Sequence, residues 1–502
     1  MTQVASNRTQ VVRDEPVRPD GAYVLYWMLA QRRTASNFAL ERAAAWAETL
    51  KRPLLVFEPL RVGYRWASDR LHRFVIEGMA DNAARCAAAG VRYFPYVEPT
   101  HGAARGLLSA LSAQAAVVVT DDYPAFIIPG LIAAAARAIP VRLESVDSVG
   151  LLPMRSTDEV FATAYAFRRH LQRVLPGHVT ARPTPDPLEP LRGGEMAAID
   201  PAVTKRWPAA DLEGLLAPGG LSSLPIDHTV APVAMRGGSE SANRSLKRFL
   251  DERLAGYADD RNDVNHDVTS GLSPFLHFGH ISSHDVFWRL MQREGWLGDL
   301  SRRANGAREG WWGVSAPAEA FLDQLITWRE LGFNMCAHRS DYDRYESLPG
   351  WARTTLARHA TDRRDSIYTL ETFERAQTHD ALWNAAQGQL VAEGRIHNYL
   401  RMLWGKKVLE WTATPEDALA VLIELNNKYA IDGRDPNSYS GIFWTLGRYD
   451  RPWGPERPIF GTVRYMSSAN TTRKMNVRGY IARYAPGPPQ PSLFGEREAA
   501  GA

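Results

Sequence analysis

Short, nearly continuous apolar runs alternate with longer amphipathic segments through the first 150 residues. The apolar runs cover residues 22–28, 53–57, 91–97, 116–120 and 141–146. Helical spacing follows the first two runs, across residues 37–50 and 71–89. Strands that are apolar on both faces and separated by helices are typical of a parallel sheet covered on both sides. The pattern predicts an α/β domain with a doubly wound, Rossmann-like parallel sheet across residues 21–182. No GxGxxG motif follows the first run, so an NAD site is not predicted.

The segments that flank this domain differ from it in composition. Residues 1–20 are polar and charged, without the apolar core of a signal peptide, and are predicted to form a disordered arm. Residues 183–240 are rich in Pro, Gly, Ser and Ala, which indicates a linker that crosses the surface or a functional loop. Helical periodicity then dominates, so residues 241–485 are predicted to form an all-helical domain. The last stretch, 486–502, is predicted to be a disordered tail.

Bulk composition narrows the classes of protein. The 502 residues exceed what one hydrophobic core usually supports, and no window approaches about 18 uninterrupted apolar residues. A cytoplasmic protein without a membrane span is therefore expected. The only cysteines, Cys86 and Cys336, exclude a disulfide framework, a cysteine-ligated zinc finger and a four-cysteine iron–sulfur cluster. No metal site is predicted, and any redox chemistry must come from a bound organic cofactor.

Charge and aromatic content each allow two interpretations. Lys and Arg number 59 against 56 Asp and Glu, a net charge of +3 without a long basic run, which neither demands nor excludes nucleic acid. Eleven of the 15 Trp residues lie after position 280. Large aromatic cores need Trp, but a planar cofactor or stacked bases housed in the helical half would also account for this concentration.

One segment of the helical half carries hydroxyl groups where they suit a phosphate. Thr269, Ser270, Gly271 and Ser273 place hydroxyls and a flexible backbone directly before a helical pattern that begins near Pro274. Such a segment can donate hydrogen bonds to a diphosphate, although the same residues serve more often as an ordinary helix N-cap.

A second segment, GRIHNYLRMLWGKKVLEW, combines polar and aromatic residues on one face. On a helix its Asn398, Arg401 and Trp404 lie on the same side. A buried Arg needs a partner, and the downstream Asp432 and Asp435 are candidate counter-charges. The set fits either a ligand site or a structural Arg–Asp bridge between helix and loop.

These segments resemble the FAD-binding region of the class II cyclobutane pyrimidine dimer photolyases, a branch of the photolyase/cryptochrome superfamily. The motifs that carry the resemblance follow the family's order and spacing: TSGLSPFLHFGHIS, ITWREL, WNAAQ, EGRIHNYLRMLWGKKVLEW, LNNKYAIDGRDPN and ERPIFGTVRYM. They span residues 257–484, while the N-terminal sheet resembles the family's antenna domain more loosely. The resemblance implies light-dependent repair of pyrimidine dimers in DNA by an electron from photoexcited, reduced FAD.

The resemblance implies a U-shaped FAD within the helical domain. The residues implied to hold its phosphate and ribose side are Tyr257, Thr269, Ser270, Gly271, Leu272 and Ser273. The residues implied to frame the isoalloxazine are Arg329, Asn398, Arg401 and Asp432. Asn426 matches the family's asparagine at flavin N5, where a neutral amide can accept a hydrogen bond without imposing a charge.

Electron transfer and DNA binding are implied in the same way. The aromatic residues that match the family's path for photoreduction are Trp404, Trp383, Trp411 and Tyr368. Trp328 and Trp444 match the tryptophans that flank a dimer flipped out of double-stranded DNA. Arg451 and Arg464 match basic residues that contact the DNA. For each Trp the alternative is plain core packing, and for each Arg it is an ordinary surface position.

One departure from the family pattern touches the chemistry. The family places a glutamate near the dimer, and this chain has Gln324 there. An amide can donate a hydrogen bond to a thymine carbonyl but cannot supply a proton. The neighbouring Asp323 would point about 100° away on a helix, so its ability to replace the glutamate stays open. Ser36 and Tyr449 also replace usual family residues, which leaves the antenna chromophore undecided between a deazaflavin, a folate and none.

Gln324 also favours the main alternative, a cryptochrome-like flavin photoreceptor that has lost or weakened repair. Retention of Trp328 and Trp444 favours repair. A light-independent flavin oxidoreductase would need a nicotinamide motif, which is not found. A non-catalytic DNA-binding module would leave the set of Asn398, Arg401 and Asp432 unexplained. The expected partner is double-stranded DNA that contains pyrimidine dimers, and no obligate protein partner is inferred.

Overall fold

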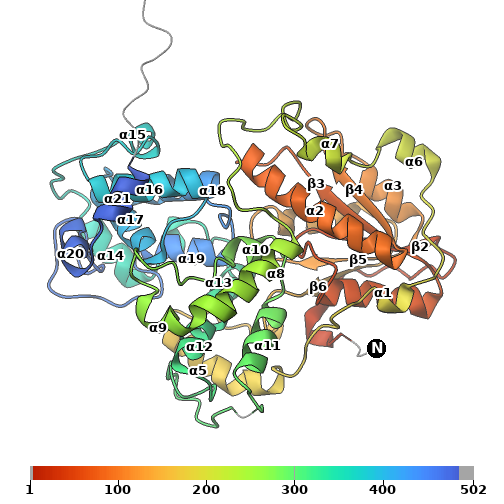
Figure 1. Cartoon of the computed structure of the whole chain (residues 1–502), viewed down its shortest axis with the longest axis horizontal. Helices are drawn as coiled ribbons and strands as arrows, with labels where there is room; N and C mark the ends of the chain where they lie inside the picture. The colour runs from red at the N-terminus through yellow and green to blue at the C-terminus, as the bar shows by residue number, and fades with distance from the viewer. Residues whose placement is uncertain (1–3, 299, 486–502) are drawn as a thin grey trace, which may run out of the picture.

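Five parallel strands form the body of a six-stranded sheet in the N-terminal half of the chain (Figure 1). Their bounds are β2 Tyr23–Trp27, β3 Leu54–Leu60, β4 Arg92–Val97, β5 Ala115–Asp122 and β6 Leu143–Asp147. Their spatial order, β6-β5-β2-β3-β4 with every neighbouring pair parallel, is that of a doubly wound sheet. This is a computed structural model that describes residues 4–298 and 300–485. The fold class predicted from the sequence is confirmed.

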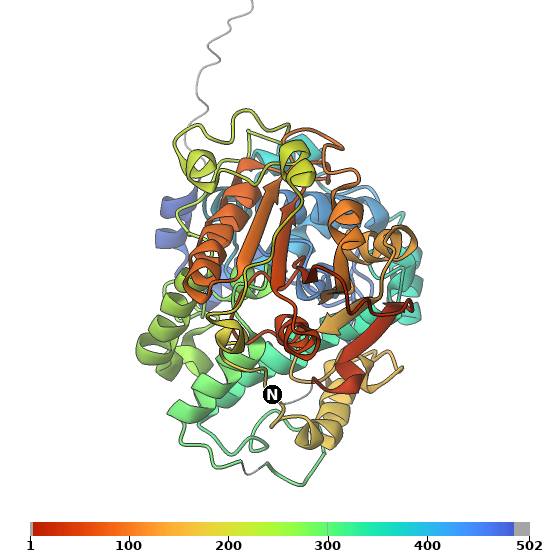
Figure 2. The ribbon, with the colours of Figure 1, turned by 90° about the vertical axis from the view of Figure 1, so that its right-hand side faces the viewer.

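Helices cover both faces of this sheet (Figure 2). They are α1 (Phe38–Leu50) and α2 (Asp69–Ala89) on one face, and α3 (Leu107–Ala113) and α4 (Ile128–Ala138) on the other. Because side chains alternate along a strand, Val24 and Tyr26 pack with α1, whereas Leu25 and Trp27 pack with α3 and α4. Helix α1 begins after Asn37, whose side-chain oxygen accepts from the backbone N–H of Ala39 at 3.0 Å.

The predicted disordered arm is wrong over residues 4–20, the part of it that the structure describes. Strand β1 (Thr9–Arg13) pairs antiparallel with β6 and forms an edge of the sheet. Just before it, Arg8 is 1% exposed, and its guanidinium donates to the Leu151 carbonyl at 2.7 Å. The polar composition suggested a solvated arm, but strand pairing and buried acceptors satisfy its polar groups instead.

Residues 183–240 form a packed crossing segment rather than a free linker. They include α6 (Pro201–Arg206) and α7 (Leu212–Leu216). The buried Trp207 belongs to the core of the α/β domain and donates from Nε1 to the Ala103 carbonyl at 2.8 Å. The abundant Pro and Gly residues therefore mark turns within a packed segment.

The rest of the chain is helical and shares one hydrophobic core. Its helices are α5 Ala164–Val174, α8 Ser239–Arg248, α9 Tyr257–Asp260, α10 Ser273–His277, α11 Ser283–Arg293, α12 Ala316–Leu322, α13 Arg329–His338, α14 Gly350–Arg358, α15 Leu370–Glu374, α16 Ala381–Glu393, α17 Asn398–Glu410, α18 Pro415–Tyr429, α19 Pro436–Trp444, α20 Ser468–Lys474 and α21 Arg478–Tyr484. Single turns of 3-10 or π type across the chain are η1 Ser6–Arg8, η2 Met154–Ser156, η3 Leu175–Gly177, η4 Glu189–Leu191, η5 Phe249–Arg253, η6 Leu254–Gly256, η7 Asp323–Trp328 and η8 Tyr345–Ser347. Helix α5 precedes the predicted boundary at residue 182, yet its Phe167 and Leu171 belong to this core.

Two further sequence expectations concern the membrane and the chain ends. Within residues 4–298 and 300–485, no helix is both long enough and apolar enough to cross a bilayer. The first three residues of the predicted arm and the predicted tail, 486–502, lie outside the described residues.

Candidate functional site

Helix α17 carries the polar cluster that the sequence spacing puts on one face. Arg401 Nη2 lies 3.2 Å from Asp432 Oδ1, with the two side chains 21% and 12% exposed. One turn earlier Asn398 is exposed, and one turn later Trp404 is buried. The face therefore runs from an open rim at Asn398, past a half-buried ion pair, to the core at Trp404.

The second candidate counter-charge, Asp435, has different partners. It accepts a hydrogen bond from the Tyr123 hydroxyl at 2.9 Å, and His277 Nδ1 lies 3.4 Å from the same carboxylate. Burial alone would raise the pKa of Asp435, but the hydrogen bond and charge of His277 hold it below its ordinary value. Asp435 thus joins the helical domain to the α/β domain, and Asp432 pairs with Arg401.

Asn426 lies near the end of α18 and is 3% exposed. Its Nδ2 donates to Asn427 Oδ1 at 3.1 Å and to Ser438 Oγ at 2.9 Å. Within the described part of the chain its Oδ1 receives no hydrogen bond. An amide held in this way has an acceptor left over, as its predicted position at flavin N5 requires.

The loop before α10 has features of a phosphate-binding turn and also features of an ordinary helix cap. Ser270 Oγ accepts from the backbone N–H of Leu272 at 3.3 Å, so this hydroxyl serves as a local cap. Gly271 has φ of +66°, and no atom lies within 4 Å of the position that a Cβ would take. Thr269 and Ser273 remain partly or fully exposed beside this open space. Because α10 has only five residues, its dipole is small, and the groups of the loop would have to supply most of the attraction for a diphosphate.

Two of the predicted cofactor residues make packing contacts in this structure. Tyr257 is 8% exposed, and its ring meets Phe321 edge-to-face with centroids 5.5 Å apart. Arg329 is 6% exposed and donates from Nη1 to the Val149 carbonyl at 2.6 Å, across the domain boundary. Their contact with a flavin stays a prediction.

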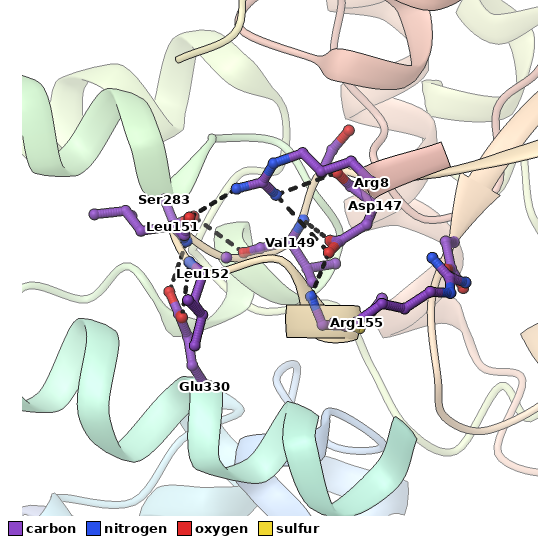
Figure 3. A network of polar contacts seen from close by, with 12 residues as sticks. Arg8, Asp147, Val149, Leu151, Leu152, Arg155, Ser283 and Glu330 are labelled. Atoms are coloured by element: carbon purple, nitrogen blue, oxygen red, sulfur yellow. Dashed lines mark hydrogen bonds and ion pairs between the residues drawn. The ribbon is translucent and has the colours of Figure 1, made fainter. Parts of the chain in front are cut away.

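Beside Arg329, Glu330 joins α13 to the loop that follows β6 (Figure 3). Its carboxylate accepts from the backbone N–H groups of Leu151 at 2.7 Å and Leu152 at 3.1 Å. Arg8 donates to the Leu151 carbonyl from the other side of the loop. Burial is the largest influence and raises the pKa of Glu330 to about 7, although these N–H groups and the charge of Arg329 oppose it. Arg8 and Glu330 thus fix the loop from both domains. The same contacts tie α13, the helix that follows Trp328, to the α/β domain.

Four aromatic residues form a continuous chain that begins on α17. Trp404 and Trp383 are stacked, with centroids 6.2 Å apart and planes 6° from parallel. Trp383 is followed by Trp411 at 6.1 Å, and Trp411 by Tyr368 at 5.7 Å. The three Trp side chains are buried and Tyr368 is half-buried, so the chain leads from the core toward solvent. The structure brings together all four residues predicted for electron transfer, and their role stays a prediction.

Gln324 and Trp328 lie on the π-helical turn η7 and are half-buried. Such turns are rare and occur often at functional sites, because they redirect side chains within a helix. Asp323 at the start of this turn pairs with Arg168 of α5, whose Nη2 lies 2.7 Å from Oδ1. One oxygen of the Asp323 carboxylate is therefore engaged by Arg168. Whether Asp323 replaces the family's glutamate stays the question that the sequence raises.

Trp444, at the end of α19, lies close to two basic side chains. Lys406 Nζ is 4.9 Å from the ring centroid and the guanidinium carbon of Arg464 is 5.5 Å from it. Lys406 is fully buried and donates to the Thr445 carbonyl at 2.6 Å, and burial lowers its pKa to about 7. Sequence reasoning missed this lysine, although a charged pair inside the apolar stretch WGKKVL was the available signal.

The two predicted DNA-binding arginines share one aromatic neighbour. Arg464 lies 4.0 Å and Arg451 lies 4.5 Å from the ring centroid of Trp453. Arg451 is exposed, whereas Arg464 is half-buried and pairs with Asp450 at 3.2 Å. The structure brings both residues to the side of the molecule that carries Trp444.

A cavity of about 430 Å³ lies at the carboxyl ends of the strands, where the α/β domain meets the helical domain. Its walls are mainly apolar and include Trp27, Phe57 and Phe126, with Tyr123 and Arg434 from either side of the domain boundary. This edge is the usual ligand position in doubly wound sheets. Sequence reasoning missed the cavity because its walls come from loops that are far apart in the chain.

The residues beside α17 fit a flavin dinucleotide. Arg401 balanced by Asp432 offers a fixed cation to a polar ring edge, and Gly271 leaves room for a bulky group at the neighbouring loop. Asn426 has an acceptor oxygen that no described residue occupies. The fit rests on this set of donors and acceptors and on the open rim at Asn398.

No family model matches the chain. Comparison with curated proteins finds relatives that share one name. The chain is 35% identical over 468 residues to the deoxyribodipyrimidine photo-lyase of Methanothermobacter thermautotrophicus, which covers 92% of this chain and 94% of that protein. It is 34% identical over 492 residues to the deoxyribodipyrimidine photo-lyase of Oryza sativa subsp. japonica, with coverage of 95% and 90%.

Solved structures resemble the chain in fold. A class III photolyase from Agrobacterium tumefaciens aligns with a TM-score of 0.66 at 17% identity, over 92% of this chain and 86% of that one. A cryptochrome from Synechocystis aligns with a TM-score of 0.67 at 13% identity, over 92% and 88%. At these identities the structural likeness concerns the fold alone.

Proposed function

The chain belongs to the deoxyribodipyrimidine photo-lyase family, and on that basis we propose that it repairs cyclobutane pyrimidine dimers in DNA with light, using FAD bound in its helical domain. The observation that carries the proposal is helix α17. This one helix bears both Arg401 of the predicted flavin site and Trp404, the first residue of the aromatic chain. Photoreduction of an oxidised cofactor needs such a connection between the cofactor and the surface.

Bound, reduced FAD supplies the electron for repair when it absorbs light. We propose that Asn398, Arg401 and Asp432 hold its ring and that residues 269–273 hold its diphosphate. Fixed charges act strongly in a site from which water is excluded, so the Arg401 guanidinium favours an anionic ring while Asp432 keeps the guanidinium in place. The oxygen of Asn426 accepts a hydrogen bond at N5.

On the substrate side, Trp328 and Trp444 flank a dimer that has left the base stack. A damaged pair is less costly to extrude than an intact one, which contributes to selection. Gln324 donates a hydrogen bond to a thymine carbonyl but holds no transferable proton. Arg464 and the exposed Arg451 attract the DNA backbone near Trp444.

The aromatic chain supplies electrons to an oxidised cofactor from outside the protein. Trp404 would pass one electron to the light-excited, oxidised cofactor, and the electron hole left behind would move outward through Trp383 to Trp411 or Tyr368. An external reductant would refill the hole at that outer end. Because neighbouring rings are about 6 Å apart between centroids, no step between these four residues crosses a long gap.

We further propose that the cavity at the carboxyl edge of the sheet holds an antenna chromophore, a planar aromatic molecule such as a deazaflavin or a folate. Apolar walls such as Phe57 and Phe126 suit a flat ring system, and Arg434 suits a polar or anionic substituent. Released cofactors separated by chromatography and identified by mass spectrometry test this: a second chromophore besides FAD is expected, and Phe57→Asp should abolish its retention without removing FAD.

The repair proposal is tested with a duplex that carries one cyclobutane dimer within a restriction site. Illumination with FAD-loaded protein should restore cleavage of the site, and incubation in the dark should not. A duplex with a 6–4 photoproduct at the same position serves as the specificity control and should stay uncut. Restoration in the dark would refute a photochemical reaction.

Gln324 supports a second candidate, a cryptochrome-like photoreceptor that keeps the flavin chemistry. The absence of a proton donor at this position weakens repair more than photoreduction. A protein that is photoreduced through Trp404 but never restores the restriction site would favour this candidate.

A further inference from the structure

Asn427, the residue after Asn426, is fully buried and lies at the centre of a polar network. Its Oδ1 accepts from the backbone N–H of Arg434 at 2.9 Å and from Asn426 Nδ2 at 3.1 Å. Its Nδ2 donates to the Tyr439 hydroxyl at 3.2 Å. No solvent is available to replace these partners, so each atom of the amide has one defined role.

The backbone N–H of Arg434 determines the orientation of both amides. A backbone N–H can only donate, so the atom of Asn427 that faces it must be the oxygen. The atom of Asn426 that faces this oxygen must then be its amide nitrogen. Ser438 Oγ holds the same nitrogen from a second direction at 2.9 Å. If Asn426 turned over, two amide oxygens would face each other and the nitrogen would lose both partners.

The same turn also supplies the predicted partner of Arg401. Arg434 has φ of +68°, and its guanidinium donates to the carbonyls of Asn427 at 2.6 Å and Ile431 at 3.1 Å. Gly433 is closely packed, since a Cβ there would stand 2.9 Å from the Asn426 carbonyl oxygen. Asp432 is therefore carried by a turn that is tied directly to Asn426 and Asn427.

We propose that Asn427 is a positioning residue that fixes the Asn426 carboxamide with its oxygen toward flavin N5, and that it thereby helps to set the reduction potential of the bound FAD. The inference rests on the proposed FAD site. Reduction of the ring adds electrons and a proton at N5, so an acceptor at that atom stabilises the reduced ring, whereas an amide N–H in its place stabilises the oxidised ring. Loss of the orienting contacts therefore lowers the reduction potential.

The test is the midpoint potential of FAD in the full-length protein, measured by anaerobic titration with dithionite. Asn426→Leu should lower the potential, and Asn427→Leu should reproduce at least half of that change because the amide can then turn over. Ser438→Ala removes the second acceptor and should lower the potential by a smaller amount. Tyr439→Phe is the matched control: both contacts of Asn427 Oδ1 remain, so the potential should equal that of the wild type.

Several results would overturn the positioning role. One is a potential that falls in Asn426→Leu but equals the wild-type value in Asn427→Leu. Another is an unchanged potential in Asn426→Leu itself, which would remove the need for an orienting residue. If Asn427→Leu does not fold, Asn427→Ala, which removes the same carboxamide without a bulky replacement, decides the question, with an unchanged potential counting against the role. A wild-type protein that binds no FAD would instead refute the proposed function, so the two failures are distinguishable.

Discussion

Replacement of Glu330 by Gln should change how the stability of the protein depends on pH. The carboxyl is buried between α13 and the loop after β6, and burial raises its pKa from 4.5 to about 7. Below pH 4.5 it is protonated in the folded and unfolded chains, and its contribution to stability is fully present. As the pH rises toward 7, the unfolded chain releases its proton first, so the folded state loses stability. The whole loss corresponds to about 3 kcal/mol.

Most of this loss falls in an accessible pH range. Between about pH 5.5 and pH 8, linkage predicts that the wild type loses about 2 kcal/mol of unfolding free energy through Glu330. Gln cannot ionise, so Glu330→Gln should lack this decline. The variant also replaces one carboxylate acceptor, facing the N–H of Leu151 or Leu152, by an amide nitrogen, which costs about 1–3 kcal/mol at every pH. The titration of Glu330 is therefore seen in how the difference in unfolding free energy between the two proteins changes with pH, and not in the size of that difference at one pH.

Urea denaturation of both proteins at each pH, with FAD bound to both, measures this difference. The unfolding free energy of the wild type minus that of Glu330→Gln should fall by about 2 kcal/mol from about pH 5.5 to pH 8. Glu346→Gln, an exposed glutamate on η8, serves as the control and should show no comparable trend. A difference that is flat across the range, or that grows in favour of the wild type, would refute the reasoning.

Three further predictions concern the proposed chemistry. Gln324→Glu should raise the number of dimers repaired per absorbed photon, because it restores a group that can donate a proton, and an equal or lower yield would contradict this role. Trp383→Phe should strongly slow the photoreduction of oxidised FAD, because it removes the indole between Trp404 and Trp411. The same variant, once chemically reduced, should repair dimers at the wild-type rate. Equal loss of photoreduction and repair would count against an electron path. Asp432→Asn should weaken FAD binding by about 1–3 kcal/mol, because Arg401 loses its charged partner. Fluorescence titration of the apoprotein with FAD measures the affinity, and an unaltered affinity would place the ion pair outside the cofactor site.

Features that depend on local periodicity could be predicted from the sequence. The five parallel strands follow from apolar runs, and the face shared by Asn398, Arg401 and Trp404 follows from helical spacing. The pairing of Arg401 with Asp432 was one of two alternatives, and the structure selects it. In each case the signal lies within one element or between two elements joined by a short segment.

Features that depend on distant contacts could not be predicted in this way. Strand β1 has a polar sequence, and it forms because β6 offers a free edge and the loop at Leu151 offers acceptors to Arg8. The burial of Lys406 depends on Thr445 and Trp444, which another helix contributes. Such positions become visible only when the partners that satisfy a buried charge are in place.

Dimer loss catalysed by fully reduced, FAD-loaded protein tests the central claim most directly. The protein is photoreduced without oxygen, mixed with a dimer-containing oligothymidylate and exposed to near-UV light, and recovery of the thymine absorbance is followed. The expected result is many dimers split per bound FAD under light and none in darkness. Protein that is reduced and stable, yet leaves every dimer intact under light, would contradict electron delivery from this site to a pyrimidine pair.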